Sequence, residues 1–248
     1  MKKTKELLGE ALEKFDAKSY IQSDPIQIIR KMYTEQPDST LPDVELCAMF
    51  TAMVNWGKKS DAIVAANRLM DMCDWNPSEF VEYGDFYDIA DGKQIYRTIS
   101  GKMFKDVCHT LRQFYRQHGC IVNVIKNNKQ SANFKDLFYS LCQWFAPARL
   151  GSPDRNSACK RICTLLRWMI REDKVDLGLW KANYINPSDL YAILDTNVCQ
   201  QAKRLNLISY PRESWKAVLE LTDAYRRWDA RDPLKYDLVL NSTNIILE

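Results

Sequence analysis

The 248-residue sequence is poor in glycine, proline and histidine, with 8, 9 and 2 of each. Few glycines and prolines mean few tight turns, which argues against an all-β fold and favours long helices with short connections. No stretch sustains the apolar/polar alternation of a half-buried strand, and only YAILD and LVLNSTNIILE are weak candidates. We therefore predict an all-α fold of about a dozen helices, packed in two layers or lobes.

The chain also lacks the residue patterns of common metal sites. Eight cysteines occur, none of them in C-x-x-C spacing, and most fall in apolar helical stretches. With only His109 and His118 available, we expect no zinc or other metal site and no cofactor. The thiols are predicted to be reduced core residues of a cytoplasmic protein.

Long apolar runs and a strong charge of one sign are missing too. No run approaches the roughly 20 residues that span a membrane, and the charged start MKKTKELLGEALEKFD does not resemble a signal peptide. We therefore expect no membrane partner. The net charge of +3 is too small to demonstrate a polyanionic partner, so any basic patch must be local. The even spread of charge gives no reason to expect more than a monomer.

Helical periodicity and capping signals run along most of the chain. Helices are predicted at 3–17, from Asp24, at 44–56, from 58, from Asn76, at 101–118, 121–128, 133–145, 157–172 and 195–205, and twice more near the C-terminus. The stretch 84–100 is irregular, with loops and a short helix expected. The loop FAPARLGSPDRNS, at 145–157, marks a boundary between lobes. We predict a single helical unit over 1–248, with lobes 1–24 plus 146–248 and 25–145.

The segment SDLYAILDTNVCQQAKRLNLI places Asp195 between an apolar run and a helix. This position is suited to an N-cap, whose carboxylate accepts hydrogen bonds from amides two and three residues further on. Those bonds and the helix dipole favour the ionised carboxylate. Asp195 either caps the helix alone or also meets a substrate.

A second concentration of charge surrounds Lys160. Over residues 151–171 there is one acid, Asp154, so the local charge is 5 − 1 = +4. Its basic residues are Arg155, Lys160, Arg161, Arg167 and Arg171. A helix N-terminus with excess positive charge suits phosphate binding, and a solvated basic helix face is the alternative.

These two segments resemble a known superfamily. ILDTNVCQQAKRLNLI is similar to the VDTHVxRVxxRLGLV segment of the helix-hairpin-helix DNA glycosylases, and SACKRICTLLRW is similar to their lysine-bearing helix. The likeness is confined to about residues 155–210 and is nearest to the archaeal 8-oxoguanine glycosylases. SACKR, LRWM, LDT-V and DP-KYD also resemble motifs of an uncharacterised bacterial family, over roughly residues 20–240.

The superfamily resemblance implies a fold and a chemistry. It implies two lobes with a cleft between them, and double-stranded DNA with a damaged base, such as an oxidised purine, as the partner. Lys160 and Asp195 take the catalytic positions: the amine attacks the sugar C1′, and the carboxylate stabilises the positive charge that develops there. The target nucleotide must first leave the base stack.

The chain also departs from the superfamily pattern. The hairpin glycines are missing apart from Gly151, so phosphate capture falls to Arg155, Ser157, Arg161 and the helix amides. Asn197 replaces a frequent histidine. The four-cysteine loop of some members is absent, so no iron–sulfur cluster is expected.

Candidates for contacts with the base and the DNA backbone come from a second region. The turn NWGKKSD, at 55–61, follows a buried helix, and there Lys58 and Lys59 are expected to meet phosphates. A solvated turn is the alternative. The weaker base-pocket candidates are Asn55, Trp56, Trp144 and Asp237, although core packing is the usual role of such aromatic residues.

The function predicted from these features is base-excision repair, by a DNA glycosylase with associated lyase activity. One alternative is a non-catalytic nucleic-acid-binding protein on the same scaffold. Another is a helical protein-interaction domain in which Asp195 is a simple cap. Fold resemblance does not by itself establish activity.

Overall fold

The computed structural model describes residues 2–127, 133–181 and 185–242. Within them the fold is all-α, as predicted, with thirteen α-helices and one small hairpin. The helices are α1 Lys2–Glu13, α2 Ala17–Gln22, α3 Ile26–Glu35, α4 Leu41–Val54, α5 Lys59–Met72, α6 Pro77–Tyr83, α7 Gly101–His118, α8 Ile121–Asn127, α9 Phe134–Trp144, α10 Lys160–Ile170, α11 Thr196–Arg204, α12 Trp215–Trp228 and α13 Lys235–Ser242. Short 3₁₀ turns lie at Asp85–Asp88, Ala146–Ala148, Pro153–Arg155 and Pro187–Asp189.

Capping residues in the sequence mark several helix ends. Asn76 caps α6 through its side chain, Pro77 takes the first helical position, and Gly84 ends the helix in the left-handed region with φ 86°. The predicted helix over 3–17 is wrong in extent, because α1 ends at Glu13. A new helix, α2, then starts under the cap of Asp16, whose Oδ1 accepts a hydrogen bond from the Lys18 amide.

The irregular stretch 84–100 contains a hairpin that the periodicity did not predict. Strands β1, Gln94–Tyr96, and β2, Ile99–Ser100, pair antiparallel, and Arg97 in the turn has φ 48°. Strands of three and two residues are too short to show alternation, which explains the miss. The weak strand candidate YAILD, at 191–195, does not form a strand. LVLNSTNIILE begins inside α13, and its residues 243–248 lie outside the described residues.

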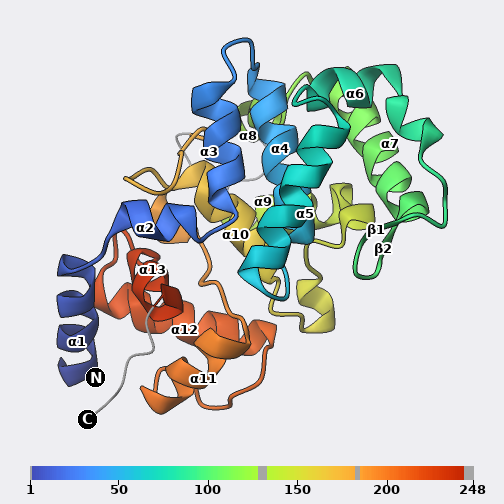
Figure 1. Ribbon diagram of the computed structural model, residues 1–248. Helices are drawn as coiled ribbons and strands as arrows, with labels where there is room; N and C mark the ends of the chain where they lie inside the picture. The colour runs from blue at the N-terminus through green and yellow to red at the C-terminus, as the bar shows by residue number, and fades with distance from the viewer. Residues whose placement is uncertain (1, 128–132, 182–184, 243–248) are drawn as a thin grey trace.

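The helices bury two clusters of apolar side chains. The larger cluster draws mainly on residues 20–193 and surrounds α4, whose positions from Asp43 to Val54 are all buried. The smaller one joins Leu8 of α1 to residues of α11, α12 and α13. Figure 1 shows these two groups of helices, with α10 between them. The predicted lobe boundaries remain a prediction.

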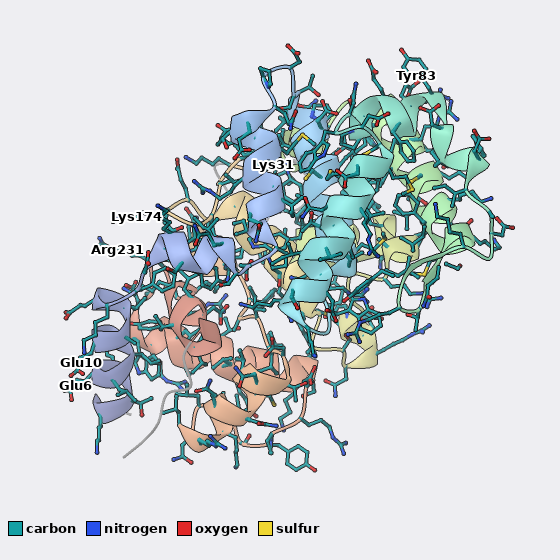
Figure 2. All side chains as sticks on the ribbon, viewed as in Figure 1. Glu6, Glu10, Lys31, Tyr83, Lys174 and Arg231 are labelled. Atoms are coloured by element: carbon teal, nitrogen blue, oxygen red, sulfur yellow. The ribbon has the colours of Figure 1, made fainter. Side chains whose placement is uncertain are left out.

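Helix α1 is held against the C-terminal helices by one face. Leu8 is fully buried in the smaller cluster, while Glu6 and Glu10 are exposed. Figure 2 shows both glutamates on the outer side of α1. This division follows from helical periodicity, which places residues two positions apart on different faces.

Buried charges hold the centre of the fold together. The Glu45 carboxylate of α4 accepts four hydrogen bonds, from Tyr115 Oη, the Ile121 and Val122 amides and Trp180 Nε1, at 2.7–3.0 Å. Burial raises the pKa of Glu45, and these donors oppose the shift. The carboxylate therefore ties α7, α8 and the segment after α10 to α4.

Arg167 of α10 and Arg171, the residue that follows the helix, are part of the core and not of a basic surface. Arg167 and Arg171 are 1% and 4% exposed. Arg167 Nε lies 3.2 Å from Asp176 Oδ1, and Arg171 pairs with both Asp176 and Asp232. The predicted basic face over 151–171 is therefore reduced to its N-terminal part, because the buried pairs neutralise the rest.

Two further sequence predictions concern the cysteines and the helices. All eight cysteines are free, and seven of them are buried, as expected of core thiols. Among the described residues, no helix has both the length and the apolar character that a membrane crossing requires.

Candidate functional site

Asp195 caps α11, as the sequence predicts. Its backbone is extended, with φ −119° and ψ −179°, and its Oδ1 accepts a hydrogen bond from the Val198 amide at 2.9 Å. The cap leaves Oδ2 available for another partner. The apolar run before it, which includes the fully buried Leu194, anchors the cap in the smaller core cluster.

Lys160 supplies the partner for the second carboxylate oxygen. It is the first residue of α10, and its Nζ lies 3.1 Å from Asp195 Oδ2. The two side chains are 21% and 20% exposed, so the ion pair is half-buried but open to solvent. The fold thus brings together two residues that are 195 − 160 = 35 positions apart in the sequence.

The loop before α10 has an unusual backbone. Arg149, Asn156 and Cys159 all have positive φ, between 49° and 55°, a conformation that non-glycine residues seldom adopt. A Cβ on Gly151 would lie 2.9 Å from both Cβ and Sγ of Cys159, so only glycine fits there. Left-handed residues of this kind cost about 1–3 kcal/mol each and cluster at functional sites.

A pocket of about 930 Å³ opens beside this loop and the start of α10. Ligand pockets in proteins usually fall between about 300 and 1,000 Å³, so this volume is at the upper end of that range. The lining residues are Trp56, Tyr139, Cys142, Gln143, Ala146, Arg149 to Asp154, Arg155, Ser157 to Arg161, and Glu213. Lys160 is among them, whereas Asp195 reaches the pocket through its contact with Lys160.

The pocket wall is cationic. It carries four basic side chains and two acidic ones, a balance of 4 − 2 = +2. The basic residues are Arg149, Arg155, Lys160 and Arg161, and the acidic ones are Asp154 and Glu213. Three predicted DNA contacts, Arg155, Ser157 and Arg161, therefore lie at one pocket together with Lys160. Ser157 Oγ accepts a hydrogen bond from the Cys159 amide at 3.2 Å, which orders the entry to α10.

Trp56 is the one base-pocket candidate that lines this pocket. Tyr96 meets its ring edge-on with centroids 5.8 Å apart, and the Arg97 guanidinium lies 5.1 Å from the ring centroid. The hairpin thus covers part of the indole. Lys58 is exposed, but Lys59 forms an ion pair with Asp24 at 3.2 Å, and neither lysine lines the pocket.

The other three base-pocket candidates do not line this pocket, and their role in base binding stays a prediction. Asn55 is 6% exposed and ends α4. Trp144 packs on Phe114, with ring centroids 5.8 Å apart. Asp237 is 1% exposed in the core. For an aromatic residue such as Trp144, the residue type alone does not distinguish core packing from a binding role.

Asp237 is nonetheless chemically unusual. Its Oδ2 accepts a hydrogen bond from the Ile193 amide at 2.9 Å, and the Tyr225 hydroxyl also interacts with this carboxyl. Burial raises the pKa of Asp237 to about 7, although the positive charge of Arg167 opposes the shift. The negative charge of Asp195 raises it further. The pKa of this buried carboxyl therefore lies close to neutral pH, within the electrostatic influence of Asp195.

Sequence reasoning missed several pocket residues. Arg149, Tyr139 and Glu213 line the wall but belong to three separate segments. The sequence offers one indication for Arg149, because it is a basic residue in the loop predicted at 145–157. It offers none for Glu213, because the approach of that residue depends on the packing of the segment before α12. Its Oε1 accepts a hydrogen bond from Thr196 Oγ1 at 2.5 Å.

Together these features define an all-α protein with a lysine–carboxylate pair at the wall of a cationic pocket. Residues 24–246 match the family described as "Protein of unknown function (DUF2400)", and the chain belongs to this family. No curated protein and no solved structure matches the chain.

This family match corrects the predicted relationship. The assignment to the helix-hairpin-helix DNA glycosylase superfamily is wrong, because the match covers residues 24–246 and points to a different family. The likeness had rested on about 155–210. An aspartate at the N-cap, followed by an apolar residue in the first turn, is also common where an amphipathic helix begins, so a short segment of this kind recurs without common descent.

Proposed function

We propose that the chain is a DNA-repair enzyme that removes a damaged base and forms a Schiff base at Lys160, with Asp195 assisting. One observation carries the proposal: Lys160 Nζ lies 3.1 Å from Asp195 Oδ2 at the wall of a cationic pocket of about 930 Å³. The proposal rests on this geometry and on the chemistry of the two groups. It does not rest on a relationship with known glycosylases.

The amine and the carboxylate are arranged for proton transfer. A lysine attacks carbon only as the neutral amine, so its ammonium group must first lose a proton. Asp195 Oδ2 is within hydrogen-bond distance of Nζ, while Oδ1 stays bound to the Val198 amide. The cap fixes the orientation of the carboxylate, and the carboxylate fixes that of the amine.

The proposed reaction begins with the neutral amine of Lys160. The lone pair of Lys160 Nζ forms a bond to the sugar C1′, the bond from C1′ to the base breaks, and the base leaves with that electron pair and takes up a proton. Nζ, which became positively charged on attack, then gives up one proton, and its lone pair expels O4′ from C1′. O4′ takes up a proton, and an iminium joins C1′ to Nζ. Loss of a C2′ proton and cleavage of the C3′–O3′ bond complete the lyase step. The Asp195 carboxylate stabilises the positive charge near C1′.

The pocket provides the supporting environment for a nucleic-acid substrate. Its positive wall suits the phosphodiester backbone, which dominates the affinity of proteins for DNA. Its volume accommodates one nucleotide that has left the base stack. Tyr139 and Trp56 supply aromatic surface on the same wall.

Borohydride trapping tests the proposal. The protein is mixed with duplexes that carry an abasic site, an oxidised purine, uracil or an alkylated base, and is then reduced. Wild type should give a covalent complex with at least the abasic duplex, and Lys160→Gln should give none. Lys174→Gln removes an exposed lysine remote from the pocket, on the segment between α10 and α11 (Figure 2), and should trap like wild type. A wild-type protein that traps no duplex overturns the enzymatic proposal.

A non-catalytic nucleic-acid-binding protein is the second candidate. One observation favours it: the Lys160–Asp195 pair joins the start of α10 to the cap of α11, which is also what a purely structural ion pair does. Under this function DNA binds with a steep dependence on salt, but no covalent complex forms. Trapping and binding, measured on the same preparation, separate the two candidates.

A further inference from the structure

Two arginines on the pocket wall are left without acidic partners. Arg149 is exposed at the end of the 3₁₀ turn after α9, and Arg161 is half-buried in the first turn of α10. Among the described residues, neither guanidinium has a carboxylate within ion-pair distance. Within the described part of the chain, the Arg161 guanidinium makes a single hydrogen bond, from Nη1 to the Met53 carbonyl at 3.3 Å.

The two guanidinium groups also repel each other. Burial lowers the pKa of Arg161, and the positive charge of Arg149 lowers it further. By contrast, the other buried arginines, Arg167 and Arg171, are each neutralised by aspartates. A cation that is partly desolvated, next to a second cation and without an anion, is unfavourable unless a ligand supplies the missing charge.

We propose that Arg149 and Arg161 together bind one phosphate group of the nucleic-acid substrate at the wall of the pocket. Guanidinium groups bind phosphate through two parallel N–H···O bonds and keep their charge when desolvated, which an ammonium group does less well. The ligand is a phosphodiester of the strand whose nucleotide faces Lys160. The assignment deepens the proposed function and rests on it for the identity of the phosphate source.

The surroundings favour a phosphate over a carboxylate-bearing protein segment. Arg155 and the Lys160 ammonium add positive charge on the same wall, so a strongly charged ligand gains most. Of the two wall acids, Glu213 is bound to Thr196, and Asp154 is exposed. The left-handed backbone at Arg149 fixes the direction in which its side chain leaves the loop.

The test measures DNA affinity against salt with a duplex that carries a tetrahydrofuran abasic analogue, which binds but cannot react with an amine. The variants are Arg149→Gln, Arg161→Gln and the double variant. Arg227→Gln, an exposed arginine in the last turn of α12, is the matched control. The slope of log affinity against log salt should fall by about 0.9 in the double variant, the value for one phosphate contact. The control should keep the wild-type slope.

Because Arg161 is half-buried, thermal melting is used to check that Arg161→Gln folds. If it does not fold, the exposed Arg149→Gln variant alone carries the test. A slope unchanged in Arg149→Gln and in any folded double variant overturns the assignment. Inorganic phosphate distinguishes the source. If it raises the melting temperature of wild type but not of Arg149→Gln, and the DNA slope does not change, the ligand is free phosphate and the nucleic-acid assignment fails.

The outcomes separate this inference from the proposed function. A lower slope in the arginine variants, without borohydride trapping by wild type, keeps the phosphate site and rejects the lysine chemistry. Trapping that depends on Lys160, with an unchanged slope, keeps the chemistry and rejects the phosphate site.

Discussion

Substitution of Asp195 separates its two structural roles, because each carboxylate oxygen has its own partner. Oδ1 caps α11 through the Val198 amide, and Oδ2 pairs with Lys160 Nζ. Asp195→Asn keeps an oxygen for the cap, since asparagine is as good an N-cap as aspartate, but it removes the charge. Asp195→Ala removes both the cap and the charge. The two variants therefore differ by the cap alone.

The expected sizes follow from these contacts. Loss of an N-cap costs about 1 kcal/mol. An ion pair open to solvent contributes about 0.2–1 kcal/mol, and with side chains about one-fifth exposed we take about 0.5 kcal/mol for Lys160–Asp195. Asp195→Ala should thus lower the free energy of unfolding by about 1.5 kcal/mol, and Asp195→Asn by about 0.5 kcal/mol.

Denaturant unfolding followed by circular dichroism measures both values. For a chain of this size the losses correspond to about 3–6 °C in Tm for Asp195→Ala and about 1–2 °C for Asp195→Asn. A cycle with Lys160→Gln should give a coupling of about 0.5 kcal/mol. If Asp195→Asn and Asp195→Ala lowered the free energy of unfolding equally, the N-cap hydrogen bond would make no contribution to stability, and the reasoning would be refuted. In both variants borohydride trapping should fall, because neither keeps the carboxylate.

Three further predictions concern stability. The folded pKa of Asp237, about 7, lies above its unfolded value of about 3.9. The folded state therefore binds an extra proton, and the free energy of unfolding falls as pH rises from about 4 to above 7. Asp237→Asn should flatten this fall between pH 5 and pH 8 in urea titrations, and an unchanged pH profile would contradict the prediction. Gly151→Ala should lower the free energy of unfolding by about 1–3 kcal/mol, because the added methyl group overlaps Cys159. Gly9→Ala, in open space within α1, should raise it by about 1 kcal/mol. Equal effects of the two variants in calorimetry would rule out the steric explanation. Glu45→Gln should lower the free energy of unfolding by about 2–6 kcal/mol. The reason is that the NH₂ group of the glutamine would face two donors that now bind a carboxylate oxygen. A decrease below about 1 kcal/mol in chemical denaturation would show that the four hydrogen bonds contribute little to stability.

Local signals predicted much of the fold. The Asn76–Pro77 start of α6 and the Asp195 cap follow from residue types that satisfy helix ends in any context. The hairpin at 94–100 was missed because its strands are too short to show a period. Local preferences act over a few residues, so they predict helix ends better than pairing between distant segments.

The candidate site was only partly predictable for the same reason. Lys160 and Asp195 stand out by type and position, and the fold places them 3.1 Å apart. Arg167 and Arg171 look equally available in the sequence, yet Asp176 and Asp232 neutralise them in the core. Which basic residues remain unpaired depends on long-range contacts. The contrast between Arg161 and Arg167, six positions apart on α10, could therefore not be predicted.

The central claim, that Lys160 is an amine nucleophile toward a DNA sugar, is tested most directly by locating the adduct. Wild type is reduced with borohydride on an abasic duplex, digested, and the modified peptide is sequenced by mass spectrometry. The account predicts a sugar-derived adduct on Lys160 and none on any other lysine, including Lys58 and Lys59 of the turn after α4. An adduct on another lysine, or no adduct under conditions where DNA binds, would contradict it.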